Sequence, residues 1–534
     1  MTVDRSLRPD PAMEGRVEAW LTETDLTPTE AERGLDRFLD DFPVTPQARR
    51  RFLGRWLDRD EGAGRRTGEH GHPPVATNRR TRLMFSATAL VAALAILAIG
   101  VSVVETGPGP FDTGAGGGAT HVVAADGSGD YDTIQAAVDA AEDGDTVLVQ
   151  PGTYTESVIV DKDIAVAGDG SPDEVTLRIG DDAPTFIFDG GDSEWPYGLS
   201  LMSADAAVSD LTVSGPSQAI AVLIDGGSPI IDGLIIDLEP FEDEGGERII
   251  GMAFMVLGGA TPSIRDSSWD AYFDIGDGAG PTIEGNVITA NVISVNGPGT
   301  TTVRGNTFLD GAETSASDGA IGLIEDNEFS GGGIGIDTGS DMIVRGNDIR
   351  DAEENAISIE RASALIEDNT VVGAEVGIEV DYGIDVTVRG NAIESTGGCG
   401  ITIGGPGTDV VATGNVVRTS DTGICTSTSA AATIEDSDLI GNGTGIKLNS
   451  EDVHVSSNRI HENDVGLRIL VGSPTIVGNT FTGNRAGLAF GPRPVTPTLT
   501  DNEFCENEVL LEVPDGTEPP ALDGNEICED APAA

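Results

Sequence analysis

Lysine is almost absent from this sequence, which has only Lys162 and Lys447 among its 534 residues. The chain carries 30 Lys+Arg against 90 Asp+Glu, a formal net charge of −60 at pH 7. Residues 1–82 hold 15 of the basic and 15 of the acidic residues, so the excess of acid lies entirely beyond them. Such a surface repels nucleic acid and anionic lipid. We therefore expect no nucleic-acid partner and a solvated acidic face, with Ca²⁺ binding as the alternative.

Cysteine and histidine are also scarce. Four cysteines in a chain of this length do not make a disulfide scaffold. Beyond residue 82 only His121, His454 and His461 occur, far apart in the sequence, so histidine acid–base chemistry has little material. No Ser-His-Asp arrangement, P-loop or zinc-ligand spacing is present. The sequence therefore assigns no catalytic residue, no metal ligand and no cofactor.

The most regular feature is an asparagine that recurs in an aliphatic-x-x-Asn-x-aliphatic frame. Successive copies are 20 to 24 residues apart, and Ser437 fills the one position that lacks asparagine. A fixed period of this length is typical of a solenoid, in which one unit stacks on the next. The copies are Asn286, Asn306, Asn327, Asn347, Asn369, Asn391, Asn415, Asn458, Asn479, Asn502 and Asn525.

A second short strand follows each asparagine. It starts with glycine and alternates aliphatic and polar residues, as in Gly377–Val380. A leucine-rich repeat is the rival architecture, because its strand also ends in a buried asparagine. Here Ile, Val and Phe dominate, and a strand stands where that repeat places a helix. We therefore predict an all-β fold, a single-stranded parallel β-helix of about 16 coils, over residues 121–531.

Residues 83–104 form an uncharged run of 22 residues rich in Leu, Ala, Val and Ile. As a helix with a rise of ~1.5 Å per residue it would span roughly 33 Å, enough for the hydrocarbon core of a membrane. Three arginines precede it, so the positive-inside rule places the N-terminus in the cytoplasm and the acidic repeat outside. More than 80 residues precede the run, which favours a transmembrane anchor over a cleaved signal peptide. Residues 105–120, rich in Gly and Pro, are expected to form a linker.

Residues 1–82 are predicted to be a small helical segment in the cytoplasm. Thr27-Pro28-Thr29-Glu30 combines an N-cap, a proline at the first position and a glutamate at the third, and Thr45-Pro46 opens a second helix. The segment resembles the cytoplasmic stubs of bacterial one-pass regulators, including anti-sigma-factor-like proteins. The His/Cys cluster that some of those carry is absent.

The stretch from His121 to Gly168 carries the most specific pattern. Its elements are Val123–Tyr131, Thr133–Val138, Gly144–Val147 and Pro151–Tyr154. Together they closely resemble the opening of pectinesterases and other pectin-lyase-like, right-handed parallel β-helix proteins. The resemblance implies a right-handed β-helix, and a helix around Thr133–Ala141, with Ile134, Val138 and Ala141 on one face, suits the cap that its first coil needs.

The same resemblance implies that the protein is an enzyme, but the sequence does not match the catalytic motifs of these families. The chain lacks the glutamine-containing motif of pectinesterases and the Arg-Trp pair that follows their catalytic aspartate. It also lacks the Gly-His-Gly and Arg-Ile-Lys elements of polygalacturonases. We therefore regard enzymatic activity as uncertain and favour a non-catalytic role.

Charge alternates at the position two residues before each repeated asparagine. In a parallel stack these side chains would form one column on the outer face, where alternation avoids like charges one strand apart. We interpret this column as a structural ladder that fixes the register, and not as a catalytic site. Its members are Arg265, Glu284, Arg304, Glu325, Arg345, Glu367 and Arg389.

Two cysteines occupy equivalent positions in neighbouring coils. Cys505 and Cys528 each follow a repeated asparagine by three residues. Neighbouring strands lie ~4.7–4.9 Å apart, within the Cα separation that a disulfide accepts. We predict a disulfide between them. Cys399 and Cys425 stand at different offsets, so the spacing does not support their pairing.

Binding sites of solenoids tend to lie where loops interrupt the stacking. The interval from Gly233, which we place in the asparagine position, to Ser267 is 34 residues and contains the acidic loop 239–247. Aromatic rings beside carboxylates could stack on sugars, or two carboxylates could hydrolyse a glycosidic bond; Trp269 also fits an inward core position. The candidate binding residues are Glu194, Trp195, Tyr197, Trp269, Asp270, Tyr272 and Asp274.

These patterns predict a membrane-anchored, single-pass protein that displays an extracellular β-helix for surface binding or scaffolding, with carbohydrate as the expected ligand class. Neutral glycans or a protein partner suit the charge of the chain better than polyuronate does. Two alternatives stay open. One is a membrane-tethered polysaccharide lyase, hydrolase or epimerase, and the other is a one-pass signalling receptor that acts through residues 1–82.

Overall fold

The computed structural model describes residues 118–188, 194–202, 205–242, 248–249, 251–276, 278–427, 429–515 and 519–528. The expected cytoplasmic segment 1–82, the transmembrane helix at 83–104 and most of the linker 105–120 lie outside these residues. Within the described residues, no helix has the length and apolar character needed to cross a membrane.

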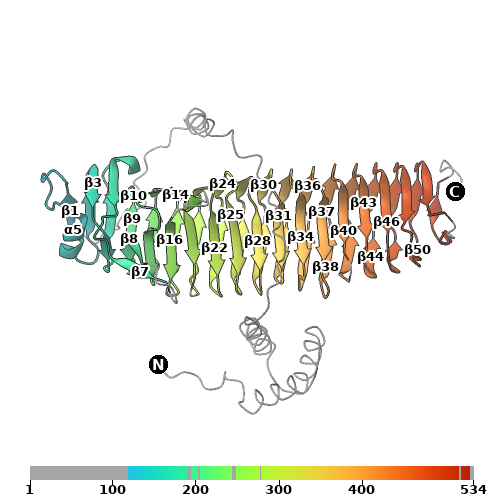
Figure 1. Ribbon diagram of the computed structural model, residues 1–534, viewed down its shortest axis with the longest axis horizontal. Helices are drawn as coiled ribbons and strands as arrows, with labels where there is room; N and C mark the ends of the chain where they lie inside the picture. Colours follow the sequence, from blue (N-terminus) through green and yellow to red (C-terminus); the bar gives the residue numbers. More distant parts are fainter. Residues whose placement is uncertain are drawn as a thin grey trace, which may run out of the picture. The chain divides into compact units, whose positions relative to one another are not determined.

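The chain winds into a stack of coils, and each regular coil contributes one strand to each of three parallel sheets (Figure 1). Sheet A runs from β1 (Thr120–Val123) to β50 (Thr498–Thr500), and sheet B from β3 (Gly152–Thr155) to β53 (Glu526–Ile527). Among the described residues sheets A and B contain 17 strands each, against the expected coil number of about 16. Sheet C runs from β4 (Val158–Val160) to β52 (Val509–Glu512).

Sheets A and B meet at the repeated asparagine. The inner strands of sheet A are β2 (Thr146–Val149), β5 (Ala165–Gly168), β9 (Ala207–Ser209), β12 (Ile230–Asp232), β17 (Ser263–Arg265), β20 (Thr282–Glu284), β23 (Thr300–Arg304), β26 (Ile321–Glu325), β29 (Asp341–Arg345), β32 (Ser363–Glu367), β35 (Val386–Arg389), β38 (Asp409–Thr413), β41 (Ala431–Glu435), β44 (Asp452–Ser456) and β47 (Thr475–Val477). Those of sheet B are β6 (Val175–Arg178), β10 (Thr212–Gly215), β13 (Ile235–Leu238), β18 (Ser268–Trp269), β21 (Val287–Thr289), β24 (Thr307–Leu309), β27 (Glu328–Ser330), β30 (Asp348–Arg350), β33 (Thr370–Val372), β36 (Ala392–Glu394), β39 (Val416–Arg418), β42 (Asp438–Ile440), β45 (Arg459–His461), β48 (Thr480–Thr482) and β51 (Glu503–Cys505).

Sheet C forms the third wall and is interrupted by a hairpin and by a register shift between Met252 and Phe254. The hairpin strand β7 (Thr185–Ile187) pairs antiparallel with β8, and a second hairpin, β14 (Phe241–Glu242) with β15 (Arg248–Ile249), lies in the acidic loop. The inner strands of sheet C are β8 (Glu194–Leu201), β11 (Ile220–Asp225), β16 (Met252–Leu257), β19 (Tyr272–Ile275), β22 (Val292–Asn296), β25 (Glu313–Ser317), β28 (Ile334–Asp337), β31 (Asn355–Glu360), β34 (Val376–Asp381), β37 (Cys399–Gly404), β40 (Thr422–Thr426), β43 (Thr444–Leu448), β46 (Val465–Ile469) and β49 (Ala486–Phe490).

The corner between sheets A and B is a tight turn through a left-handed residue. The residue before the asparagine has positive φ, such as Asp326 at 53°, and Gly and Asp adopt this region at the least cost. Gly233, at φ 66°, lies in this turn position, because Asp232 is directly opposite Arg265. The placement of Gly233 in the asparagine position was therefore wrong by one residue, and Leu234 occupies that position.

Each buried asparagine bonds to both neighbouring coils. Asn327 Nδ2 donates to the carbonyl oxygen of Val303 at 3.0 Å and to Asn347 Oδ1 at 2.9 Å, and its backbone N–H donates to the same Oδ1 at 3.0 Å. Ser437 keeps part of this pattern, because its Oγ accepts from the N–H of Asn415. The ladder thus satisfies polar groups that the turn buries.

A second asparagine ladder at the corner between sheets B and C was not identified from the sequence. Asn442 Nδ2 donates to Asn463 Oδ1 at 3.1 Å, and the same contact recurs in the following coils. The signal was available, since each member follows an asparagine position of the first ladder by five residues. Its members are Asn442, Asn463, Asn484 and Asn507.

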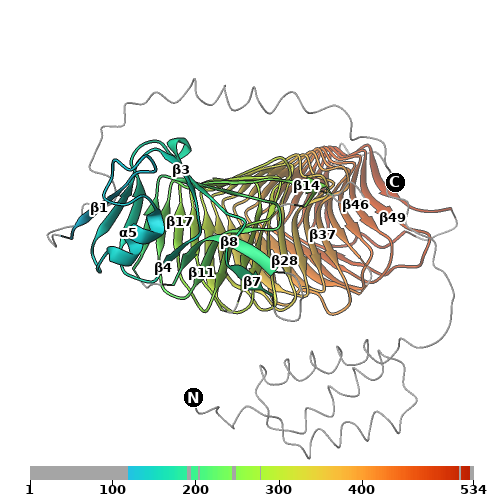
Figure 2. The same ribbon diagram turned by 60° about the vertical axis from the view of Figure 1, so that its left-hand side comes forward.

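One continuous apolar core fills the lumen from Val123 to Leu510. Aromatic rings stack along the axis, with the centroids of Phe308 and Phe329 4.3 Å apart. The short helix α5 (Ile134–Ala140) closes the first coil beside β1 and buries its apolar face (Figure 2).

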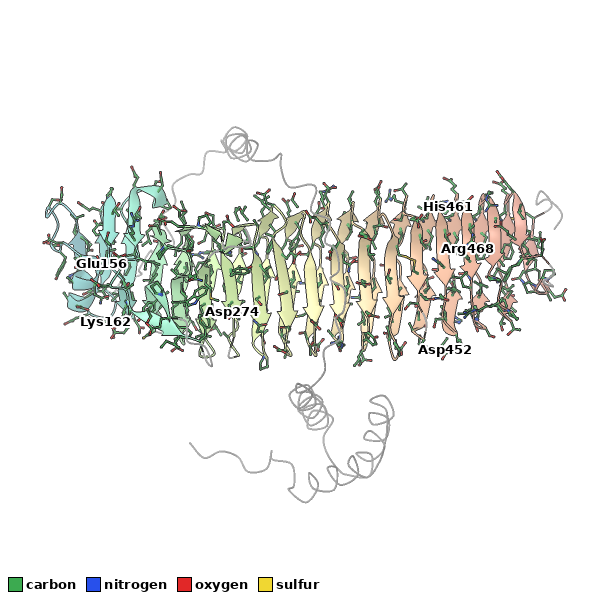
Figure 3. All side chains as sticks on the ribbon, viewed as in Figure 1. Glu156, Lys162, Asp274, Asp452, His461 and Arg468 are labelled. Carbon is green, nitrogen blue, oxygen red and sulfur yellow. A yellow bond between two sulfur atoms is a disulfide. The ribbon has the colours of Figure 1, made fainter. Side chains whose placement is uncertain are left out.

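Opposite charges hold the two ends of α5. Glu156 accepts from the backbone N–H groups of Ile134 and Gln135 at 2.9 Å, and Lys162 Nζ donates to three carbonyl oxygens at the other end (Figure 3). Both contacts complement the helix dipole.

The charged column lies on the outer face of sheet A. Arg304 Nη2 bonds Glu284 Oε2 at 2.8 Å, and Arg345 and Arg389 bond the glutamates that precede them by one coil. Arg265 bonds Asp232 at 3.0 Å, so the alternation begins one coil earlier than the sequence indicated.

Candidate functional site

The two candidate tryptophans lie on different sides of the coil wall. Trp269 is 3% exposed in the lumen, where its ring centroid is 5.2 Å from that of Phe254 and 5.8 Å from that of Phe273. Its environment is therefore the core and not a ligand surface. Trp195 lies in the β7–β8 hairpin and is half-buried.

The hairpin builds a second, smaller apolar cluster on the outer face of sheet C. The Trp195 ring meets Phe188 edge-on at 5.5 Å, and Phe188 meets Phe186 at 5.2 Å. These rings pack on Leu223 and Met255, which point away from the lumen, together with Tyr197. The aromatic residues of this region thus hold the hairpin against the sheet, and Glu194 is exposed on it.

The other three candidates follow this cluster in the next coil. Asp270, at the corner after β18, accepts from Asn291 Nδ2 at 2.7 Å. Tyr272 is 46% exposed, and Asp274 is directly opposite Met255 in the sheet. The structure therefore brings Tyr272 and Asp274 together with the hairpin cluster and separates Trp269 from them.

Asp274 begins a polar row on the outer face of sheet C. Asp274 Oδ1 accepts from Asn296 Nδ2 at 2.9 Å, and Asn296 Oδ1 accepts from the hydroxyl of Ser317 at 2.8 Å, so three coils share one network. Burial raises the pKa of the Asp274 carboxyl, and the hydrogen bond from Asn296 opposes that rise. In stacking order the row is Asp274, Ser294, Ser315, Gly335, Ser358, Glu379 and Thr402.

A shallow groove of about 350 Å³ lies in the middle of this face. Its polar lining comes from Ser315 and Ser317 of β25, Asp337 of β28, and Ser358 and Glu360 of β31. The absence of a side chain at Gly335 keeps its floor low, and an added Cβ there would meet only Ser315 Cβ, at 3.8 Å. The groove offers hydroxyl donors and carboxylate acceptors to a ligand.

Carboxylates gather at the far side of the groove. Glu360 lies directly between Asp337 and Asp381 on neighbouring strands. Burial raises the pKa of Glu379, a hydrogen bond from Asn355 opposes the rise, and the charges of Asp381 and Glu360 add to it. Oxygen ligands of this kind suit Ca²⁺, but carboxylates on an open sheet face enclose no ion and we assign no metal site.

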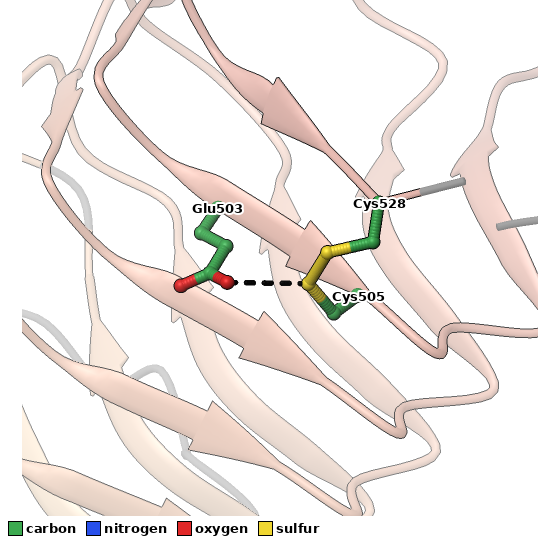
Figure 4. Close-up of side chains that lie close together, drawn as sticks. All are labelled: Glu503, Cys505 and Cys528. Atoms are coloured by element: carbon green, nitrogen blue, oxygen red, sulfur yellow. Dashed lines mark hydrogen bonds between the residues drawn. A yellow bond between two sulfur atoms is a disulfide. The ribbon is translucent and has the colours of Figure 1, made fainter. Parts of the chain in front are cut away.

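One further group of ligand-type side chains lies on the last coils (Figure 4). Glu503 Oε1 is 3.3 Å from Cys505 Sγ, and a disulfide joins Cys505 to Cys528 with Cα atoms 5.0 Å apart. Because both sulfurs are consumed in the disulfide, the group offers a metal one carboxylate. It acts as a covalent staple between two coils.

A second disulfide joins Cys399 and Cys425, with Cα atoms 6.1 Å apart. The interpretation that the spacing does not support this pair was wrong. Both residues lie in sheet C on neighbouring strands, β37 and β40, although Cys425 is opposite Thr402 and Cys399 is opposite Thr422. Offsets from the asparagine miss the pair because the two cysteines are bonded without being directly opposite one another in the sheet.

The face of sheet C could not be assembled from the sequence, because the interval from the repeated asparagine to sheet C differs between coils. Ser315 and Ser358, which share one row, follow their asparagines by nine and eleven residues. The period-two alternation alone marks these serines as outward-facing.

A family model described as NosD, periplasmic copper-binding protein, matches residues 270–406 and 324–491. No curated protein matches the chain. Solved structures that resemble it include the A-module of mannuronan C-5 epimerase AlgE6 from Azotobacter vinelandii, with 14% identity, TM-score 0.30, and coverage of 74% of this chain and 94% of that one.

Two further structures are similar to the chain. They are the catalytic unit of a GH87 α-1,3-glucanase from Streptomyces thermodiastaticus (15% identity, TM-score 0.32, 73% and 66% coverage) and a family 28 exopolygalacturonase from Yersinia enterocolitica (14%, 0.27, 78% and 79%). At these identities the likeness concerns the fold alone. The chain is a parallel β-helix protein, the fold that its asparagine repeat and its opening predict.

Proposed function

We propose that the β-helix is a binding module outside the cytoplasm for a carbohydrate chain, which lies along the outer face of sheet C. The polar row and its groove carry this proposal: hydroxyls, amides and carboxylates extend over successive coils without an interrupting large side chain from Asp274 to Ser358. Sugars are recognised by polar groups of this kind, with an aromatic ring as a stacking surface.

The hairpin cluster gives the face a defined end. Tyr272 is exposed beside Met252, which packs in the cluster, so a ring is available where the polar row begins. The row is parallel to the stack, and each coil adds one position to it at ~4.8 Å intervals. A repeating polymer suits a repeating surface better than a compact ligand does.

Two disulfides and the match to a family described as periplasmic support a location outside the cytoplasm. The anchor at residues 83–104 and the cytoplasmic N-terminus stay predictions, as does a signalling role of residues 1–82.

A filled-groove variant tests the proposal. Gly335→Gln places a side chain in the groove, and the backbone tolerates it because Gly335 does not have the left-handed φ and its Cβ meets no clash. Gly397→Gln is the matched control, since an added Cβ at this exposed corner meets nothing within 4 Å. We expect the full-length protein to bind oligosaccharides on a glycan array and the Gly335 variant to lose affinity. The absence of glycan binding, or equal binding by the two variants, would contradict the proposal.

A catalytic role is the second candidate, because Glu360 and Asp381 are directly opposite on neighbouring strands. Their Cα atoms are ~4.8 Å apart along the stack, a separation that allows the close carboxylate pair of a retaining glycosidase. Release of reducing ends from a bound polysaccharide, abolished by Glu360→Gln, would support it. Binding without any turnover would leave the binding module as the function.

A further inference from the structure

Almost every basic side chain of the described coils is paired. Ten arginines form an ion pair with a carboxylate, and Lys162 bonds three backbone carbonyls. Within the described residues Lys447, Arg468 and Arg493 have neither an ion pair nor a hydrogen bond. In a chain with three acidic residues for each basic one, an unpaired cation is unusual.

Two of these three cations are neighbours. Lys447 of β43 is directly opposite Arg468 of β46 in sheet C. Lys447 is exposed and Arg468 is half-buried. Like charges directly opposite on adjacent strands repel one another, and in the charged column on sheet A such positions alternate in sign. The pair therefore carries an unfavourable interaction that a bound anion would reverse.

Nearby carboxylates do not neutralise the pair. Asp464 Oδ1 accepts from Arg485 Nε at 2.5 Å, and Glu512 Oε2 is 3.3 Å from Arg485 Nη2. Arg485 thus engages Asp464, which precedes β46, and Glu512, which lies two strands beyond Arg468 in the same row. Arg468 lowers the pKa of Asp464 through its charge, after the larger effect of Arg485, without bonding it.

The pair continues the row that contains the groove. From Thr402 the register leads to Cys425, then to Lys447, and then to Arg468. Figure 3 shows Asp274 and Arg468 toward opposite ends of the coils that lie between the hairpin and the C-terminus. The Cys399–Cys425 disulfide fixes the strand directly before Lys447. The basic pair is therefore held in line with the polar groove.

We propose that Lys447 and Arg468 form a subsite for one oxyanion group, a carboxylate, sulfate or phosphate, carried by a glycan that is otherwise uncharged. This inference rests on the proposed binding of a glycan to sheet C and names its chemical class. An ammonium and a guanidinium on adjacent strands can both donate to one oxyanion.

Acidic residues in the groove and on the strand beyond it restrict the ligand further. Asp337, Glu360, Asp381 and Glu379 lie on the three strands β28, β31 and β34, and they repel a polymer that is charged at every residue. Only a chain with its anionic group near one end can place that group over the basic pair. The charges of the face thus also orient the ligand along the stack.

Binding of three oligosaccharides to the full-length protein tests the proposal. The probes are a neutral oligoglucoside, the same oligomer with one terminal glucuronate, sulfate or phosphate group, and a fully charged oligouronate of equal length. We expect the singly charged oligomer to bind about tenfold more tightly than the neutral one, and the oligouronate to bind more weakly than either. In the Lys447→Gln, Arg468→Gln double variant the singly charged and neutral oligomers should bind equally.

The variant Arg350→Gln, Arg418→Gln is the matched control, since it also removes two positive charges, both exposed on sheet B. The advantage of the singly charged oligomer should also decrease with salt in the native protein and be independent of salt in the double variant. Comparison of the three anionic substituents identifies the oxyanion.

Inorganic sulfate provides a readout that needs no glycan. We expect sulfate to raise the Tm of the native protein more than that of the double variant. Equal binding of neutral and singly charged oligomers, with equal sulfate effects, would overturn the subsite and leave the glycan-binding function standing. If no oligosaccharide binds, the proposed function fails, and a sulfate effect lost in the double variant would still identify an oxyanion site.

Discussion

Arg345 donates a hydrogen bond from Nε to Glu325 Oε2 over 2.8 Å, and this contact joins two neighbouring coils of sheet A. Arg345 also lies directly opposite Glu367 on the next coil. We expect Arg345→Glu to lower stability, because it replaces the ion pair by repulsion from both glutamates. Arg345 is 47% exposed, so the ion pair itself is worth on the order of 0–1 kcal/mol and the reversal somewhat more.

Denaturant unfolding measures this effect, with Arg350→Glu as the comparison, since Arg350 bonds Asp348 within its own strand. Equal loss of stability in both variants would mean that the ion pairs of the column stabilise the fold no more than an isolated ion pair does.

The buried asparagines should be more important for stability than the charged column. Asn347→Ala leaves the N–H of Asn327 and the carbonyl oxygen of Ile324 without their side-chain partner. Each orphaned buried group costs about 1–3 kcal/mol. Asn347→Ser should cost less, because Ser437 shows that a hydroxyl can accept from the preceding N–H. Chemical denaturation measures both variants, and a lower midpoint for Asn347→Ser than for Asn347→Ala would contradict this expectation.

Both disulfides should contribute to stability through the unfolded chain. They close sequence separations of 26 and 23 residues, for which the chain-entropy estimate is about 3 kcal/mol each. A thiol assay under denaturing conditions should find no free cysteine before reduction and four after it. Cys399→Ser with Cys425→Ser should lower the unfolding free energy, and two free thiols in the native protein would disprove one of the pairings.

The two tryptophans should respond differently to truncation. Trp269→Ala removes a ring from the lumen and is expected to cost about 3–5 kcal/mol. Trp195→Ala removes a half-buried ring from the outer cluster, with a smaller cost of roughly 1–3 kcal/mol. Urea denaturation of the two variants compares these costs. The reverse order would indicate that the hairpin and not the lumen dominates the stability of this region.

Acid should weaken the first coil. Backbone donation from Glu142, with further bonds from His121 and Ala119, lowers the pKa of Asp145 from 3.8 to about 2. A lowered folded-state pKa stabilises the fold fully above pH 3.8, and that contribution is lost as the pH falls from 3.8 toward 2. The hydrogen-exchange protection factors of β1 and α5 should therefore fall over this range. Asp145→Asn should have lower protection factors at pH 7 and show a smaller fall in acid.

The repeat architecture was accessible from sequence because one side chain marks every coil. Asparagine is needed at the corner between sheets A and B, where it satisfies backbone groups that the turn buries. The face of sheet C has no such marker. Its outward residues follow the asparagine at varying distances, so Cys425 is opposite Thr402 although their offsets are ten and eleven residues.

The sequence also did not reveal which of the candidate binding residues lie on the same wall of the coil. The sequence groups aromatic and acidic residues between Glu194 and Asp274 by their proximity along the chain, but a coil places consecutive residues on different walls. Trp269 and Asp274 are five residues apart, yet one lies in the lumen and the other on the outer face.

The alternating column of arginine and glutamate on sheet A determines how many coils can be added to or removed from this solenoid at one time. Deleting or duplicating one coil within the column would place two like charges on adjacent strands, whereas deleting or duplicating two coils preserves every contact of that column. The asparagine ladder repeats every coil, but the charge pattern repeats every second coil. Shortened or lengthened versions of this β-helix should therefore be built in steps of two coils.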